Sequence, residues 1–201
     1  MKIVIATRNR GKIAEMKRLL GPASTPGVEV VTLADLPVVP QPREMGKTFR
    51  ENARIKALAY AEAHRLLCIA DDSGIAVEVL GGRPGVLSAR YGGDDATDEQ
   101  RNRFLVDELT RYPRPWRAAF VCAAAAALPK RVLAEASGRI DGEIVPDPRG
   151  RDGFGYDPIF LVAGLGRTMA ELPMEEKNRI SHRGQALQKL VGELRASGAL
   201  G

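Results

Sequence analysis

The sequence predicts an α/β fold with a central β-sheet flanked by helices, in a single domain that spans residues 1–201. Apolar runs typical of buried strands alternate along the chain with amphipathic helical segments. Two long strand-like segments, 117–128 and 131–144, are separated only by Pro129-Lys130. Apolar residues make up 44% of the chain, which is enough to fill the core of such a domain.

The N-terminal segment predicts a strand followed by a helix. Residues 2–6 form an apolar run typical of a buried strand. Asn9 is a favourable N-cap for the next helix, because its side chain can accept a hydrogen bond from a free backbone N–H group. The apolar face of this helix consists of Ile13, Met16, Leu19 and Leu20. Pro22 and Pro26 are expected to end this strand–helix unit.

A second strand, a proline loop and a long helix follow. Residues 28–33 are rich in Val, which favours a strand. Residues 34–47 contain three prolines, and we expect a loop there. Thr48 and Glu51 have the spacing of a capping box, which predicts that a helix begins here and continues to about His64.

Two adjacent carboxylates follow the next apolar run. Residues 66–70 predict a buried strand that ends at Asp71 and Asp72, and residues 75–80 predict a separate partner strand before a turn at 81–85. Ligands of open α/β sheets bind at the ends of strands, so these acids are candidates for a ligand site. The alternative is that they cap a turn, because Asp side chains bond readily to nearby backbone.

The C-terminal half predicts two long strands between two helices. The capping box Thr97-x-x-Gln100 predicts a helix that ends at about Arg111. The strand expected at 117–128 is rich in Ala, so a helix remains its alternative. Residues 147–155 combine Gly, Pro, Arg and Asp and predict a loop. Residues 183–195 predict a final amphipathic helix, with Ala186, Leu187, Leu190, Val191 and Leu194 facing inward.

Composition limits the partners and the compartment. The net charge of +5 favours an anionic partner, and the interspersed acids favour a small phosphorylated ligand over nucleic acid. Cys68 and Cys122 lie in apolar runs without metal-ligand spacing, which agrees with core packing in a reducing cytoplasm. The apolar run 118–128 is too short to span a bilayer. We therefore expect a cytoplasmic protein without a membrane span.

The segment Thr7-Arg8-Asn9-Arg10-Gly11-Lys12 joins the first strand to its helix and is a candidate phosphate site. Backbone N–H groups at a helix N-terminus attract anions, Gly11 permits close approach, and Lys12 adds a positive charge. The segment is not a Walker A loop, because Ile13 follows Lys12 where Ser or Thr is required. The alternative is an ordinary capped turn.

Glu44, Asp71 and Asp72 supply carboxylates that suit a divalent cation. Mg²⁺ takes hard oxygen ligands and is usually bound by one or two carboxylates together with substrate phosphates. One acid can also orient or deprotonate a water molecule for attack on phosphorus. Taken alone, Glu44 is equally consistent with a solvated loop residue.

Two C-terminal segments could enclose a nucleoside. Gly150 to Pro158 places Phe154 among three glycines, where the aromatic ring could stack on a base. Lys177 to Arg183 ends in a His-Arg pair that offers several N–H donors. The structural alternatives are a glycine hairpin for the first segment and a helix N-cap at Ser181 for the second.

With these segments, the chain closely resembles the inosine/xanthosine triphosphate pyrophosphatase family from end to end. Six motifs carry the resemblance in the same order along the chain. They are Thr7-x-Asn9-x-x-Lys12, Thr48-Phe49-x-Glu51-Asn52-Ala53, Ala70-Asp71-Asp72-Ser73-Gly74, Pro84-Gly85-x-x-Ser88-Ala89-Arg90-Tyr91, Phe154-Gly155-Tyr156-Asp157-Pro158 and Ser181-His182-Arg183.

This resemblance implies a two-lobed α/β fold with a long mixed sheet, a central substrate cleft and a homodimeric assembly. It implies hydrolysis of deaminated purine nucleoside triphosphates to the monophosphate and diphosphate, with Mg²⁺. Asp72 would be the proton acceptor, supported by Asp71, and Glu44 and Asp72 would hold the metal. The implied substrate-binding residues are Thr7, Arg8, Asn9, Arg10, Gly11, Lys12, Lys56, Ser73, Arg90, Phe154, Gly155, Tyr156, Asp157, Lys177, His182 and Arg183.

Some alternatives remain open at this point. Arg8 stands where many members of the family carry a small residue, so it either adds a phosphate contact or points to solvent. His182 and Arg183 would face the 6-oxo acceptor of inosine or xanthosine, and adenosine would present a donor there instead. Other functions to weigh are a pyrophosphatase for other modified triphosphates, a non-catalytic nucleotide sensor and a nucleic-acid-binding protein.

Overall fold

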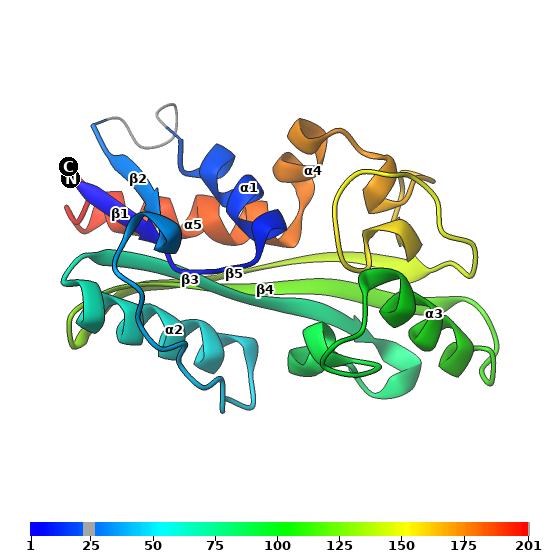
Figure 1. Ribbon diagram of the computed structural model, residues 1–201. Helices are drawn as coiled ribbons and strands as arrows, with labels where there is room; N and C mark the ends of the chain where they lie inside the picture. Colours follow the sequence, from blue (N-terminus) through cyan, green and yellow to red (C-terminus); the bar gives the residue numbers. More distant parts are fainter. Residues whose placement is uncertain (22–26, 201) are drawn as a thin grey trace. The chain divides into compact units, whose positions relative to one another are not determined.

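The computed structural model describes residues 1–21 and 27–200, and in this part of the chain six strands form one mixed sheet (Figure 1). Their order is β2-β1-β3-β4-β5-β6. β1 (Lys2–Ile5) pairs in parallel with β2 (Glu29–Thr32) and with β3 (Leu67–Val77). β5 (Arg131–Ile144) pairs antiparallel with β6 (Phe160–Val162). The predicted α/β class is therefore confirmed.

The helices of the described residues are α1 (Arg10–Leu19), α2 (Phe49–His64), α3 (Asp98–Leu109), α4 (Met174–Ile180) and α5 (His182–Ala196). α1, α2 and α3 begin where the sequence places their caps. Asn9 caps α1, and Thr48 and Thr97 form the capping boxes of α2 and α3. Pro22 and Pro26, expected to end the first strand–helix unit, lie outside the described residues. Within the described ranges, none of the helices combines the length and apolar character needed to cross a membrane.

The chain divides into two compact units. The first contains residues 1–72, 122–138 and 183–201, and the second contains residues 73–121 and 139–182. The chain passes from one unit to the other inside β3, inside β4 (Trp116–Leu128), inside β5 and at the start of α5.

The first unit has an apolar core on each face of its strands. Successive strand residues point to opposite faces, so one face of β1 and β3 packs with α1 and α5 and the other packs with α2 (Figure 1). The strand side chains facing α1 and α5 are Ile3, Ile5, Leu67, Ile69, Cys122, Ala124 and Ala126. Those facing α2 are Val4, Ala6, Cys68, Ala70, Ala123, Ala125 and Ala127.

This two-sided burial explains the alanine-rich segment of β4. A strand covered on both faces has no polar face, so its sequence does not alternate between apolar and polar residues. Residues 116–128 form a strand, and the helix alternative for this segment is wrong.

The expectation that a strand ends at the adjacent acids is wrong. β3 continues from Leu67 to Val77 with Asp71 and Asp72 near its midpoint, and the separate partner strand at 75–80 is not formed. The strand can continue because basic side chains from other elements compensate both carboxylates. Residues 78–80 form a short 3-10 helix instead.

The core of the second unit is built around the remaining parts of β3, β4 and β5. Its large buried side chains come from β3, α3, β4, β5 and β6 and include Ile75, Leu105, Leu109, Phe120, Ile144 and Phe160. β6 and α4 were not expected from the sequence. Each is too short, at 3 and 7 residues, for hydrophobic periodicity to reveal it.

Gly74 allows β3 to pass close to the Ser88 side chain, which accepts a hydrogen bond from the Ile75 N–H at 2.9 Å. A Cβ atom on Gly74 would lie 2.2 Å from Ser88 Oγ and 2.7 Å from the Gly85 carbonyl oxygen. We therefore expect Gly74→Ala to lower the free energy of unfolding by about 1–3 kcal/mol, measured by chemical denaturation.

Gly192→Ala is the matched control, because Gly192 lies in α5 with open space around its Cβ position. This change should raise the free energy of unfolding by up to about 1 kcal/mol through helix propensity. Equal effects of the two substitutions would contradict the close approach at Gly74.

Candidate active site

Residues 7–12 form a capped strand-to-helix turn in the first unit. The Asn9 side chain accepts a hydrogen bond from the Lys12 N–H at 3.0 Å, and Thr7 Oγ1 accepts one from the Asn9 N–H at 3.3 Å. Arg10 and Gly11 are the first two residues of α1. The N-terminal N–H groups of a helix carry partial positive charge, so the turn has the electrostatic character of an anion site.

Arg8 contacts a second predicted element of the site. Its Nη2 atom donates a hydrogen bond to the Val39 carbonyl oxygen at 2.9 Å. Val39 belongs to the proline loop that also carries Glu44. Arg8 therefore links the strand-to-helix turn to the loop of a predicted metal ligand, and a phosphate contact of Arg8 stays a prediction.

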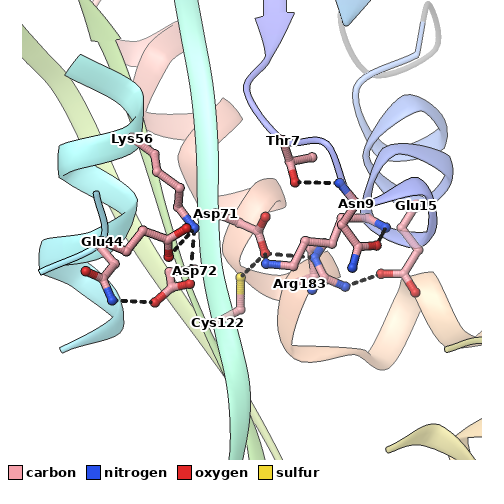
Figure 2. A network of polar contacts seen from close by, with 11 residues as sticks. Thr7, Asn9, Glu15, Glu44, Lys56, Asp71, Asp72, Cys122 and Arg183 are labelled. Atoms are coloured by element: carbon pink, nitrogen blue, oxygen red, sulfur yellow. Dashed lines mark hydrogen bonds and ion pairs between the residues drawn. The ribbon is translucent and has the colours of Figure 1, made fainter. Parts of the chain in front are cut away.

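Asp71 is the centre of a buried charge network. Its Oδ2 atom lies 2.9 Å from Lys12 Nζ and 3.1 Å from Arg183 Nε. Arg183 also forms an ion pair with Glu15 through Nη1 (Figure 2). The Asp71 and Arg183 side chains are 0% and 2% exposed. Two cations and two anions thus balance one another inside the first unit.

In this network the charges of neighbouring groups offset the effect of burial on the pKa values of Asp71 and Arg183. Burial acts to raise the pKa of Asp71, but the charges of Lys12, Arg183 and Lys56 outweigh it and hold that pKa well below its usual range. Burial acts to lower the pKa of Arg183, and the charges of Asp71 and Glu15 reverse this, so its pKa is raised. Both groups are therefore ionised at neutral pH.

Asp72 lies on the opposite side of β3 from Asp71 (Figure 2), as expected for neighbours in a strand. Its Oδ1 atom lies 3.1 Å from Lys56 Nζ, and its Oδ2 atom accepts a hydrogen bond from Asn52 Nδ2 at 3.1 Å. Lys56 Nζ also lies 3.1 Å from Glu44 Oε2. Both predicted metal ligands therefore contact the same amine.

The pKa values of Asp72 and Lys56 are both raised, for different reasons. Burial raises the pKa of Asp72, and the charges of Lys56 and Lys12 offset this only in part. The pKa of Lys56 is also raised, because Asp72, Asp71 and Glu44 outweigh its burial. Asp72 is therefore a stronger base than an exposed aspartate, and it lies next to a permanent positive charge.

The residues present fit a magnesium ion in charge and donor type. Glu44 and Asp72 supply hard carboxylate oxygens, and Mg²⁺ needs only one or two carboxylates when water and substrate phosphates complete its coordination. No group of three or more His, Cys, Asp or Glu side chains within residues 1–21 and 27–200 could hold a metal by itself. Glu44 and Asp72 are therefore the candidate carboxylate ligands of a metal at this place.

A separate polar group surrounds Asp157 in the second unit. Asp157 Oδ2 accepts a hydrogen bond from the Phe154 N–H at 2.8 Å and lies 2.5 Å from Lys177 Nζ. The Lys177 amine also lies 4.9 Å from the centroid of the Phe154 ring. The structure thus brings Phe154, Asp157 and Lys177 together, three residues that the sequence analysis had placed in one nucleoside-binding group.

The remaining predicted residues of the second unit differ in exposure. Tyr156 is buried and donates a hydrogen bond to the Ser88 carbonyl oxygen at 2.9 Å, and burial raises the pKa of its hydroxyl. The His182 ring stacks on Phe120 with centroids 4.8 Å apart. Ser73 is half-buried in β3, and Arg90 is exposed at the end of a 3-10 helix.

Sequence reasoning missed two polar residues of the first group. Glu15 is fully buried beside Arg183, and Asn52 orients the Asp72 carboxylate. Asn52 belongs to one of the six motifs that carry the family resemblance, but the sequence does not show that its side chain is buried next to Asp72. Glu15 looks like a solvated helix residue, and nothing local to it reveals a partner 168 positions away.

The sequence of this chain is similar to that of known proteins over almost its whole length. The Ham1 family model matches residues 3–193. The dITP/XTP pyrophosphatase of Geobacillus kaustophilus is 50% identical over 190 residues, which cover 94% of this chain and 92% of that protein. The dITP/XTP pyrophosphatase of Bacillus subtilis is 45% identical over 194 residues and 96% of each chain.

Solved structures agree with the sequence relatives. The structure of a HAM1 protein from Coxiella burnetii aligns with a TM-score of 0.85 and 39% identity, covering 98% of this chain and 99% of that chain. The crystal structure of a nucleoside-triphosphatase, dITP/XTP pyrophosphatase, from Mycobacterium abscessus aligns with a TM-score of 0.73 and 42% identity, covering 100% of this chain and 97% of that chain.

The buried network predicts that Asp71 is required for stability. Asp71→Asn keeps the shape of the side chain but leaves Lys12 and Arg183 with one carboxylate fewer. Breaking a buried ion pair in this way should lower the free energy of unfolding by about 3–5 kcal/mol, measured by urea denaturation.

The exposed pair of Lys2 and Glu29, whose charged atoms lie 3.5 Å apart, provides the control in the same unit. Glu29→Gln should change the free energy of unfolding by less than about 1 kcal/mol. An Asp71→Asn protein as stable as the Glu29→Gln protein would show that the buried network does not stabilise the fold.

Proposed function

The chain belongs to the Ham1 family, and on this premise we propose that it hydrolyses the deaminated purine nucleoside triphosphates ITP, dITP and XTP. The products are the nucleoside monophosphate and diphosphate. One observation carries this proposal: dITP/XTP pyrophosphatases are 43–50% identical to this chain over almost its whole length. Such activity would remove deaminated purines from the nucleotide pool and so prevent their misincorporation.

The triphosphate is assigned to the basic residues of the first unit. The capped N-terminus of α1 offers backbone N–H groups, and Lys12 and Lys56 offer ammonium groups that are already held by carboxylates. Asp71 holds Lys12 in place, so its role in this proposal is to orient a phosphate-binding amine. This differs from the direct support of Asp72 that the sequence suggested.

Glu44 and Asp72 are the proposed holders of Mg²⁺. When bound, the ion would neutralise phosphate oxygens and the charge of the leaving diphosphate. The support for this assignment is that both carboxylates lie 3.1 Å from one positive group, Lys56 Nζ.

Asp72 is the proposed proton acceptor. A water oxygen forms a bond to the α-phosphorus, the bond from that phosphorus to the bridging oxygen breaks, and the water proton passes to the Asp72 carboxylate. The raised pKa of Asp72 suits this role, because a buried carboxylate takes up a proton more readily than an exposed one. Asn52 and Lys56 each bond one oxygen of Asp72 and so fix its orientation.

The nucleoside is assigned to the second unit. Phe154 offers a ring face for stacking, and Lys177 lies close enough to that ring to add positive charge beside it. His182 is the proposed donor to the 6-oxo group, while Arg183 is the residue that ties α5 to Asp71. The 6-amino group of adenosine would place an N–H donor against the His182 donor, and neither group would then form a hydrogen bond.

The proposal extends to a homodimer in a reducing cytoplasm. Cys68 and Cys122 are free and buried, and burial raises the pKa of the Cys68 thiol to about 12, which suits packing rather than redox chemistry. Large apolar side chains that remain exposed in each unit are candidate contacts between two copies. They include Val38, Met45, Leu87 and Phe104.

A substrate panel with diphosphate detection tests the function. We expect kcat/KM for ITP and XTP to exceed that for ATP by about 100-fold, because each mismatched buried hydrogen bond costs about 1–3 kcal/mol. Activity should be lost in EDTA and restored by Mg²⁺. Equal rates on ITP and ATP, preference for modified pyrimidine triphosphates, or ITP binding without diphosphate release would each reject the proposal.

Asp72→Asn tests the proton acceptor. The amide keeps the shape of the carboxylate but is a very weak base, so kcat for ITP should fall by about 10²- to 10⁴-fold. Asp141→Asn makes the same chemical change at an exposed position and should leave kcat unchanged. A fully active Asp72→Asn enzyme with normal thermal stability would assign proton transfer to another group.

A further inference from the structure

Two side chains of α3 hold both backbone polar groups of Gly155. Asp98 Oδ2 accepts a hydrogen bond from the Gly155 N–H at 2.7 Å, and Asn102 Nδ2 donates one to the Gly155 carbonyl oxygen at 3.0 Å. The two residues are four positions apart on a helix, so they lie on the same face one turn from each other.

These contacts fix the peptide groups on either side of Gly155. A peptide group is planar, so holding the N–H of Gly155 fixes the plane between Phe154 and Gly155, and holding its carbonyl fixes the plane that follows. The Phe154 N–H is itself bonded to Asp157 Oδ2 at 2.8 Å. Three consecutive peptide planes are therefore anchored, and they set the direction in which the Phe154 side chain leaves the backbone.

Asp98 and Asn102 are themselves held firmly. Arg101 lies 2.5 Å from Asp98 Oδ1 and donates to the carbonyl oxygens of Ala89 and Ala96 at 3.0 and 2.5 Å. Asn102 is 5% exposed. The anchor thus connects the Gly155 loop to helix α3 rather than to another loop.

The surroundings of the loop show why hydrogen bonds are needed there. A cavity of about 690 Å³ lies between α3 and residues 146–159, and Asp98, Asn102 and Phe154 contribute to its wall. Gly155 has a φ of +64°, a conformation that lets the loop turn sharply. The loop therefore lacks packed protein atoms on the side of this cavity, where the hydrogen bonds from α3 reach Gly155.

We propose that Asp98 and Asn102 are positioning residues that orient Phe154 and Asp157 for the nucleoside by anchoring Gly155. The inference rests on the proposed function for its ligand, a purine nucleoside triphosphate. A loop that is already ordered loses less conformational entropy when it binds, so the anchor raises affinity without touching the substrate. Loss of the anchor therefore acts on KM more than on kcat.

Asp98→Ala and Glu99→Ala form a matched pair for the test. Both remove a carboxylate from the first turn of α3 and so remove the same favourable interaction with the helix dipole. Glu99 is exposed and pairs with Arg103, whereas Asp98 accepts from Gly155. In Asp98→Ala the KM for ITP should rise about tenfold with kcat within about twofold, and in Glu99→Ala both should stay at their original values.

Hydrogen exchange supplies a second readout that needs no substrate. In Asp98→Ala, amides in residues 150–157 should exchange faster than in the unmodified protein, and in Glu99→Ala they should not. Asn102→Asp keeps the side-chain size but replaces the donor facing the Gly155 carbonyl with an acceptor, so it should reproduce the rise in KM. This second variant keeps the inference testable if Asp98→Ala folds poorly.

The outcomes separate the anchor from the proposed function. An Asp98→Ala enzyme with unchanged KM for ITP and unchanged loop exchange overturns the positioning role and leaves the function intact. Equal changes in Asp98→Ala and Glu99→Ala also overturn it, because they indicate a general effect on α3. If the unmodified protein releases no diphosphate from ITP, the proposed function fails, and exchange in residues 150–157 still shows whether α3 anchors the loop.

Discussion

Charge compensation at Asp71 is the interaction on which the first unit depends. A fully buried carboxylate inside a strand is unfavourable unless cations reach it, and here Lys12 and Arg183 both do. These residues come from α1 and α5, elements at opposite ends of the chain. The network therefore joins both ends of the chain to β3. It also holds the strand-to-helix turn that precedes α1 in the arrangement proposed for phosphate.

One strand supplies two different environments from two consecutive residues. Asp71 faces α1 and α5 and is held ionised by its partners, whereas Asp72 faces α2 and has a raised pKa because burial outweighs its partners. Strand geometry alone produces this division, since neighbouring side chains point to opposite faces. Asp71 and Asp72 are thus neighbours in sequence with different hydrogen-bond and ion-pair partners, while the charges of Lys12 and Lys56 act on both carboxylates.

The sequence predicted much of the fold, because its local signals are strong. Asn9, Thr48 and Thr97 marked the helix starts, and the motif order indicated the family. The continuity of β3 could not be predicted, because it depends on charges that Lys12, Lys56 and Arg183 bring from distant positions. The hydrogen bond between Asp98 and Gly155 could not be predicted either, because the two residues are 57 positions apart. Local patterns show only that Asp98 lies at the start of a helix and that Gly155 lies in a loop.

The alanines of β4 have a consequence for the site on α2. Ala53, Ala57 and Ala61 on α2 share an apolar cluster with Ala123, Ala125 and Ala127, so small side chains make up much of the layer between this helix and β4. Small side chains on both elements allow the backbones of α2 and β4 to approach each other. These alanines therefore help to set the distance between the helix and the sheet. α2 also carries Asn52 and Lys56. A larger side chain in place of one of these alanines would therefore move both residues away from Asp72. The size of the core side chains under α2 therefore affects the position of the groups that orient the proposed proton acceptor, Asp72.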